Sequence, residues 1–276
     1  YSSAASDVYK RQPQMDKKGT GSDVGQNPEL VKKYTESVRK GTKKPILAKM
    51  TPNLGDMTLP AISAIEGGAN GIAAINTIKS IIGLDLGEMK PLLNIDGKSA
   101  VSGYSGQAVK PIALRFIADM KTSGKLADIS ISGMGGIKTW RDAAEFIALG
   151  CGTVQVTTAV MEFGYRIIDN LLSGMRLFMC EHGYKKIEDF RGAAVHNVVD
   201  AGNLNRDTVV YPIFNKDRCL GCGRCYISCR DGGHQAIEFD EKTRTPHILP
   251  GKCVGCHLCR LVCSVGAVGE SKRVKK

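Results

Sequence analysis

Two runs of four cysteines constrain the fold of this chain more than any other sequence feature. Glycines Gly221, Gly223 and Gly255 lie between the cysteines, where the missing side chain lets backbone amides approach sulfur. Cysteines at such close, regular spacing act as ligands, form disulfides or react as thiolates. Both runs read CxxCxxCxxxC, and they consist of Cys219, Cys222, Cys225 and Cys229, then Cys253, Cys256, Cys259 and Cys263.

The spacing of each run is that of bacterial two-cluster ferredoxins, in which the fourth cysteine of one run binds the cluster held by the other run. It therefore predicts two [4Fe-4S] clusters. On the spacing alone, two alternatives stay open: a disulfide framework, which needs an oxidising compartment, and structural zinc, which usually has separated CxxC pairs. The predicted ligands are Cys219, Cys222, Cys225 and Cys263 for cluster one, and Cys253, Cys256, Cys259 and Cys229 for cluster two.

The residues around the cysteines add detail to this prediction. Arg230 and Ser264 follow the fourth cysteines, where the usual pattern has proline, and this departure removes no ligand. Because four thiolates already serve each cluster, His234, His247 and His257 are interpreted as surface groups or neighbours of the clusters. Between the two runs, residues 236–240 and 246–249 flank a turn-like stretch and predict a hairpin.

Upstream of the cysteines, short apolar runs alternate with amphipathic stretches that end near glycine. This alternation predicts βαβ units and a parallel sheet, and four such units are half of a (β/α)₈ barrel. The predicted strands cover residues 45–50, 71–76, 128–133 and 153–158, and the predicted helices cover 59–68, 110–124 and 139–151. Cys151 and Cys180 lie on apolar stretches and are interpreted as small core residues.

Glycine, threonine and other polar residues follow the predicted strands, at the end where barrels build their active sites. Gly135 and Gly136 follow one strand and Thr157 and Thr158 follow the next, which suits the phosphate of a cofactor such as FMN. Tight turns explain the glycines equally well.

Lys49 and Asn76 also stand at strand ends. A lysine is costly to bury without an anion, so Lys49 suits the pyrimidine edge of a reduced flavin. Asn76 can both donate to and accept from a flavin or a cyclic imide, although it could equally cap a turn.

The charge and hydropathy of the chain exclude other classes. The net charge of +11 is scattered and is not interleaved with aromatic residues, so it does not indicate nucleic-acid binding. No apolar run is long enough to span a membrane and no secretory signal is recognised, so a cytoplasmic location is expected.

Several segments, in this order, resemble the FMN and iron–sulfur subunits of bacterial NAD-dependent dihydropyrimidine dehydrogenases. These are "AKMTPN", "AINT", "SGYSGQAVKPIALR", "SGMGGIKTWRDAAEFIALGCGTVQVTTAV" and the double cysteine run, and the resemblance covers about residues 13–270. It implies a dihydroorotate-dehydrogenase-like barrel that reduces uracil and thymine by hydride transfer from FMN. It also implies a partner subunit that oxidises NADH and carries FAD and further clusters.

The resemblance also assigns roles to single residues. Lys49 contacts the flavin, and Asn76 and Thr77 contact the flavin and the pyrimidine. The phosphate and ribityl chain of FMN are held by Ser105, Gly106, Gly135, Gly136, Thr157 and Thr158. The family's acid cysteine has no counterpart, because its position is occupied by Gln12, which cannot donate a proton as a thiol can.

The expected architecture is α/β: the C-terminal half of a TIM barrel followed by a small α+β ferredoxin domain. The predicted parts are an adapter-like, non-native leader (1–12), the half-barrel (13–200), a connector (201–212) and the ferredoxin domain (213–276). On this interpretation the chain is N-terminally truncated, and alone it is expected to be poorly soluble or to lack the activity of the intact enzyme. Alternatives are a related flavoenzyme with another substrate, or a module that only transfers electrons.

Overall fold

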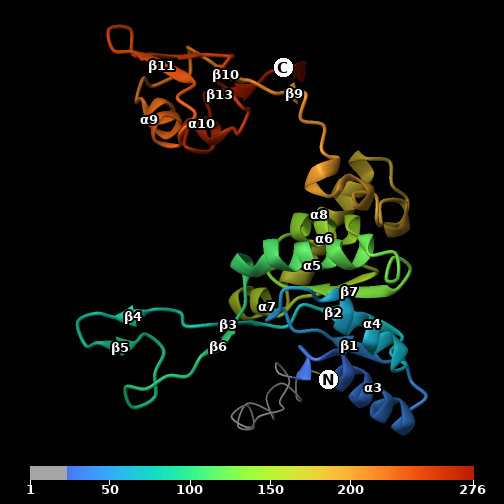
Figure 1. Ribbon diagram of the computed structural model, residues 1–276. Coiled ribbons are helices and arrows are strands. Elements are labelled where there is room, and N and C mark those ends of the chain that lie inside the picture. Colours follow the sequence, from blue (N-terminus) through green and yellow to red (C-terminus); the bar gives the residue numbers. More distant parts are fainter. Residues whose placement is uncertain (1–23) are drawn as a thin grey trace. The chain divides into compact units, whose positions relative to one another are not determined.

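The computed structural model describes residues 24–276, which divide into two compact units at Val198 and Val199 (Figure 1). Each unit is described by itself. The predicted leader and Gln12 lie outside the described residues. The predicted connector, 201–212, contains η5 (Ala201–Asn203), β9 (Thr208–Val209) and the first residue of β10, so half of its residues lie in helical or strand elements.

A four-stranded parallel sheet forms the centre of the first unit, with the strand order β1-β2-β7-β8. The four predicted parallel strands are thereby confirmed. Among the described residues, β1 and β8 each pair with one neighbour only, so the sheet is not closed into a barrel. The strands are β1 (Leu47–Lys49), β2 (Gly71–Ala74), β7 (Ser130–Met134) and β8 (Thr153–Gln155).

Helices follow the strands, as the alternating pattern predicts. They are α3 (Pro28–Gly41), α4 (Thr58–Glu66), α5 (Lys110–Thr122), α6 (Trp140–Ala148), α7 (Thr158–Phe163) and α8 (Ile167–Glu181). Local sequence explains where two of them begin. The Asn27 side chain accepts from the first amides of α3, and a Thr139–Asp142 capping box starts α6. Helix α8 packs against α6 through Trp140 and Phe178, whose rings lie 5.5 Å apart.

The core of this unit lies between the sheet and its helices. Strand β2 is buried along its whole length, and Ile72, Phe116 and Phe146 are almost completely buried. Cys151 is also fully buried, and burial raises the pKa of its thiol to about 12, so its core role is confirmed. The same prediction is wrong for Cys180, which lies on the exposed face of α8.

The segment between β2 and α5 forms a long arm that the sequence did not predict. Ribbon β3 (Ile78–Ser80)–β6 (Ser102–Tyr104) leads to hairpin β4 (Leu84–Asp85)–β5 (Lys90–Pro91), and the arm extends away from the sheet (Figure 1). The chain returns through η2 (Gln107–Val109). Large apolar side chains of the arm are exposed. The arm therefore lacks the buried face that would make apolar and polar residues alternate along its sequence.

The second unit is small and consists of antiparallel strand pairs and two short helices. Strand β10 (Pro212–Phe214) pairs with β13 (Val268–Glu270), and β9 pairs with β14 (Val274–Lys275). The predicted hairpin is confirmed as β11 (Ile237–Asp240) and β12 (Thr245–Ile248). Helices α9 (Arg224–Asp231) and α10 (Leu258–Leu261) each begin inside a cysteine run.

Short 3₁₀ turns, η3 (Ile187–Asp189) and η4 (Val195–Asn197), follow α8 at the end of the first unit. Within residues 24–276, no helix has both the length and the apolar character needed to cross a bilayer.

Gly133 on β7 tests the packing of the core. A Cβ at this position would lie 2.5 Å from Phe146 Cδ1 and 2.8 Å from Cys151 Sγ. We expect Gly133→Ala to lower the free energy of unfolding by about 1–3 kcal/mol because it overpacks the core. Phe146→Leu should recover part of this loss in the double variant. Gly41→Ala is the control, since no atom lies within 4 Å of its added Cβ; equal effects at Gly41 and Gly133, measured by denaturant unfolding, would contradict this packing.

Candidate cluster and flavin sites

A first cavity of about 400 Å³ in the second unit is walled by cysteines from both runs. Cys219, Cys222 and Cys225 come from the first run, and Cys263 comes from the end of the second. Apolar side chains, including Phe214 and Phe239, complete the wall. The structure thus brings together the four residues predicted for cluster one.

A second cavity of about 410 Å³ has the reverse composition. Three of its cysteines, Cys253, Cys256 and Cys259, come from the second run, and Cys229 comes from the end of the first. These are the four residues predicted for cluster two. Each cavity therefore takes its fourth cysteine from the opposite run.

Helix starts and backbone amides hold the cysteines in place. Gly223 (φ 71°) precedes α9 and His257 (φ 56°) precedes α10, so both helices begin at a left-handed residue between the second and third cysteines. The amides of Ala236 and Ala267 each donate to a fourth-cysteine sulfur, on Cys229 and Cys263, at 3.2 Å. Both donors lie outside the cysteine runs; within the runs, the Gly221 amide lies 3.5 Å from Cys219 Sγ, which is the kind of contact that the glycines predict.

The free thiols argue against one of the two alternatives. All ten cysteines are free, so the runs form no disulfide framework. The described cysteines are spread over the cavity walls, and no three acidic, histidine or cysteine side chains of the described residues are gathered around a single point. Cysteines spread over a cavity wall suit a cubic cluster, in which each thiolate meets its own iron.

Burial makes the third cysteine of each run a weak acid. Desolvation raises the pKa of Cys259 to about 11 and also raises the pKa of Cys225. These thiols are protonated at neutral pH, so binding a cluster would release their protons.

The three histidines near the cysteines differ in their surroundings. His247 contacts the Thr245 hydroxyl on the exposed hairpin, and His234 is exposed at the rim of cavity two. His257 also lines cavity two, and its buried Nδ1 has no hydrogen-bond partner among the described residues.

The predicted flavin residues lie at the carboxyl edge of the parallel sheet. Lys49 ends β1 opposite Ala73 of β2, and the Asn76 amide donates to Met50 O just beyond this pair at 2.9 Å. Lys49 is exposed as a residue, yet partial burial of its ammonium group lowers its pKa. No ion pair involves Lys49 in the part of the chain that the structure describes. An unpaired, partly desolvated ammonium group suits an anionic ligand.

Asn53 connects the first two strand ends, a role that was not predicted from the sequence. Its Nδ2 donates to Thr51 Oγ1 at 2.9 Å and to Thr77 O at 3.1 Å, and its Oδ1 accepts from the Lys79 amide at 2.8 Å. Its amide is therefore occupied in fixing the backbone beside Asn76.

The residues predicted for the FMN phosphate come from three loops that meet. Ser105 Oγ lies 3.0 Å from Thr158 Oγ1, although 53 positions separate the two residues. Gly136 (φ 77°) lies so close to the first loop that a Cβ there would stand 2.8 Å from Gly106 O and 2.9 Å from Lys110 Cβ. Only glycine fits such a contact at this backbone angle.

Gly135 and Thr157 complete the set. Gly135 (φ 124°) is packed over Ile75 and Ala113, and Thr157 precedes α7 with its carbonyl accepting from the Met161 amide. The hydroxyls and backbone amides of these loops are the donor types that hold a phosphate ester. The arrangement therefore fits the phosphate end of FMN.

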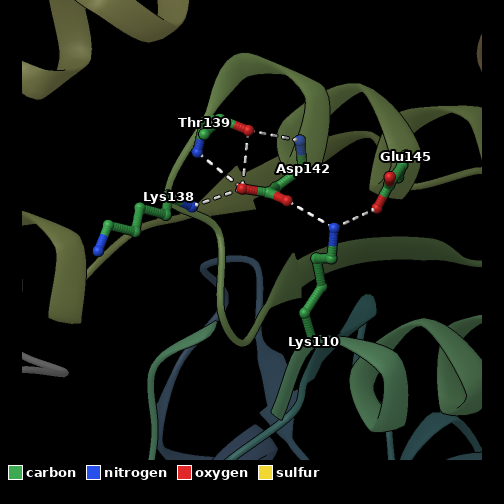
Figure 2. A network of polar contacts seen from close by, with 5 residues as sticks. All are labelled: Lys110, Lys138, Thr139, Asp142 and Glu145. Carbon is green, nitrogen blue, oxygen red and sulfur yellow. Dashed lines mark hydrogen bonds and ion pairs between the residues drawn. The ribbon is translucent and has the colours of Figure 1, made fainter. Parts of the chain in front are cut away.

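A buried ion pair fastens two of these loops together (Figure 2). Lys110, the first residue of α5, contacts Asp142 Oδ1 at 2.6 Å and Glu145 Oε2 at 2.8 Å, both on α6. The other oxygen of Asp142 accepts from the amides of Lys138 and Thr139 and from the Thr139 hydroxyl. Burial by itself would raise the pKa of Asp142, but these hydrogen bonds, led by that from Lys110, hold it below its ordinary value.

This network was not predicted from the sequence. Its local signal was the TWRD stretch, in which Thr139 and Asp142 have the spacing of a capping box. A third contact, between Lys138 Nζ and Glu162 Oε2 at 2.7 Å, links the same loop to α7. The loops at the carboxyl edge are thus held to one another by side chains that do not enter the site.

Comparison with known proteins assigns both units. A family model described as dihydroorotate dehydrogenase matches residues 16–179, and one described as a 4Fe-4S dicluster domain matches residues 213–269. The first family binds FMN, and dicluster domains bind two iron–sulfur clusters.

The curated relatives that match this chain include proteins named as dihydropyrimidine or dihydroorotate dehydrogenases. The chain is 55% identical over 262 residues to the Escherichia coli NAD-dependent dihydropyrimidine dehydrogenase subunit PreA, covering 94% of this chain and 64% of that protein. It is 39% identical over 178 residues to the catalytic subunit of dihydroorotate dehydrogenase B (NAD(+)) of Pyrococcus horikoshii, covering 64% and 56%. It is 43% identical over 181 residues to a chloroplastic dihydropyrimidine dehydrogenase (NADP(+)) of Arabidopsis thaliana, covering 64% and 42%. The chain thus spans less than two thirds of the length of each of these relatives.

The Lys110–Asp142 pair gives a test of how the loops are fastened. Asp142→Asn should lower the free energy of unfolding at pH 7 by about 1.5–3 kcal/mol, the usual contribution of a hydrogen bond to a charged group. Because the folded-state pKa of Asp142 is depressed, its contribution is present above the ordinary carboxyl pKa of 3.8 and disappears as pH falls below it. Denaturant unfolding should therefore show the two proteins converging in stability below about pH 4.

Asp119→Asn is the matched control, because Asp119 pairs with Arg115 at 2.7 Å on the exposed face of α5. That variant should lose less than about 1 kcal/mol. Equal losses in the two variants would show that the buried pair does not fasten the loops.

Proposed function

This chain belongs to the dihydroorotate dehydrogenase family, and we propose that it is the FMN- and cluster-carrying part of an NAD-dependent dihydropyrimidine dehydrogenase. The observation that carries the proposal is the combination of two four-cysteine cavities with three convergent loops at the carboxyl edge of the family's sheet. The 55% identity to a subunit of that name supports the choice of activity.

The proposed cluster ligands follow the walls of the two cavities. Cluster one is held by Cys219, Cys222, Cys225 and Cys263, and cluster two by Cys253, Cys256, Cys259 and Cys229. The backbone amides that donate hydrogen bonds to the sulfur atoms of Cys229 and Cys263 stabilise the negative charge of these two thiolates.

The proposed FMN residues have separate tasks. Ser105, Gly106, Gly135, Gly136, Thr157 and Thr158 hold the phosphate and ribityl chain. Lys49 places its ammonium group, which has no ion pair within residues 24–276, where negative charge develops on the flavin. Asn76 and Thr77 are proposed to hold the flavin and the pyrimidine; the Asn76 Oδ1 already accepts from the Thr77 amide at 2.9 Å, so the Asn76 Nδ2 is the group offered to a ligand. When bound, FMN would supply hydride transfer and the clusters would supply single electrons.

The substrates are proposed to be uracil and thymine, which are reduced to their 5,6-dihydro forms. The electrons are proposed to come from a partner subunit that oxidises NADH and carries FAD, because the relative with 55% identity is itself named as a subunit. We place this activity in the cytoplasm, where thiols stay reduced.

A second candidate is a dihydroorotate-dehydrogenase-like enzyme with another substrate, which the 39% identity to a dihydroorotate dehydrogenase B subunit favours. A panel of uracil, thymine and orotate, assayed with the complete enzyme, separates the two. Dihydroorotate oxidation without uracil reduction would overturn the pyrimidine assignment.

Anaerobic reconstitution with iron, sulfide and FMN tests the proposal as a whole. We expect about eight iron and about eight sulfide atoms, the content of two [4Fe-4S] clusters, together with one FMN per chain. Clusters without FMN would favour a module that only transfers electrons, and zinc without sulfide would overturn the cluster assignment.

Exchange of the fourth cysteine between runs gives a sharper prediction. Cys263→Ser should remove about half of the iron by damaging cluster one, although Cys263 belongs to the run that supplies cluster two. Cys180→Ser is the matched control and should leave the iron content unchanged, since Cys180 lies on α8 in the other unit. If Cys263→Ser lost iron only from the cluster bound by Cys253, Cys256 and Cys259, the assignment of Cys263 to cluster one would be refuted.

Thr158→Val tests the phosphate seat, because it keeps the side-chain shape and removes the hydroxyl that contacts Ser105. FMN should bind about tenfold more weakly, which corresponds to about 1.4 kcal/mol. Thr122→Val serves as the control, since its hydroxyl bonds only within the last turn of α5. Equal FMN affinities by fluorescence titration in all three proteins would contradict the assignment.

A further inference from the structure

The two cysteine runs differ at one position of special geometry. Both α9 and α10 begin at a left-handed residue between the second and third cysteines, Gly223 in the first run and His257 in the second. Glycine adopts this backbone conformation without strain, whereas it is uncommon for other residues, although histidine, like asparagine and aspartate, is found there more often than most. The second run therefore holds a side chain at a position where glycine would be the easier residue.

His257 lies in the wall of the second cavity. The residue lines that cavity together with Cys253, Cys256, Cys259 and Cys229. Its Nδ1 is buried and has no hydrogen-bond partner within residues 24–276. A buried ring nitrogen without a partner is costly, so this atom marks the place of a group that protein atoms do not supply.

The missing partner must be an acceptor if Nδ1 carries the proton. The sulfur atoms of an iron–sulfur cluster and its thiolates accept hydrogen bonds, and such bonds are one of the means by which a protein sets the cluster's potential. His257 is not needed as a ligand, because four cysteines already surround the cavity.

We propose that His257 donates a hydrogen bond from Nδ1 to a sulfur atom of cluster two and thereby raises the reduction potential of that cluster. The donor stabilises the reduced form more than the oxidised form, because reduction adds negative charge to the cluster. Gly223 offers no such donor to cluster one, so this contact distinguishes the two clusters. The inference rests on the proposed cluster assignment.

The test uses the reconstituted chain and its variant His257→Gly, which copies the residue of the other run and relieves the left-handed backbone. Reductive titration monitored by electron paramagnetic resonance should show one of the two midpoint potentials shifted to a more negative value and the other unchanged. His257→Asn keeps an N–H donor and is tolerated in the left-handed region, so it should restore part of the shift.

A second measurement does not depend on potentials. In protein labelled with ¹⁵N-histidine, pulsed electron paramagnetic resonance of the reduced clusters should show a hyperfine coupling between the electron spin of a cluster and a histidine nitrogen. This coupling should disappear in His257→Gly. The matched control is His234→Gly, which removes the exposed histidine at the rim of the same cavity and should keep the coupling.

The outcomes separate this inference from the proposed function. Two clusters with unchanged midpoints and no lost nitrogen coupling in His257→Gly would overturn the role of His257 and leave the cluster assignment intact. Failure of the wild-type chain to bind iron and sulfide would overturn both.

Discussion

The parallel direction of β1, β2, β7 and β8 is the constraint from which the geometry of the candidate flavin site follows. Because all four strands run the same way, their carboxyl ends meet along one edge, and the residues after them become neighbours. Lys49, Asn76, Gly135 and Thr158 are far apart in the chain but follow four adjacent strands. The Lys110–Asp142 pair then fixes two of the loops that this geometry has brought together.

The sequence was sufficient for those features that depend on local pattern. Apolar runs bounded by glycine predicted all four strands, and cysteine spacing predicted the residues that share each cavity. The 77–104 arm was not predicted, because its short strands carry exposed apolar residues and have no alternating pattern. Cys180 was misjudged because an apolar neighbourhood in sequence does not reveal which side of a helix faces solvent.

The contacts that hold the site required the tertiary structure. Lys110 and Asp142 lie 32 positions apart, and nothing in either local sequence shows that they pair. The same holds for Ser105 and Thr158, whose hydroxyls meet across 53 positions. The role of Asn53 also depends on a loop from another strand. Sequence pattern therefore predicted which residues stand at strand ends, whereas the structure supplies the side chains that support them.

The exchange of the fourth cysteine has a consequence for how the small unit assembles. Each cavity wall contains one cysteine from the opposite run, so neither run encloses a complete cavity by itself. Deleting either run would therefore remove cysteines from both cavities, whereas substituting a single cysteine removes a ligand from one cavity only.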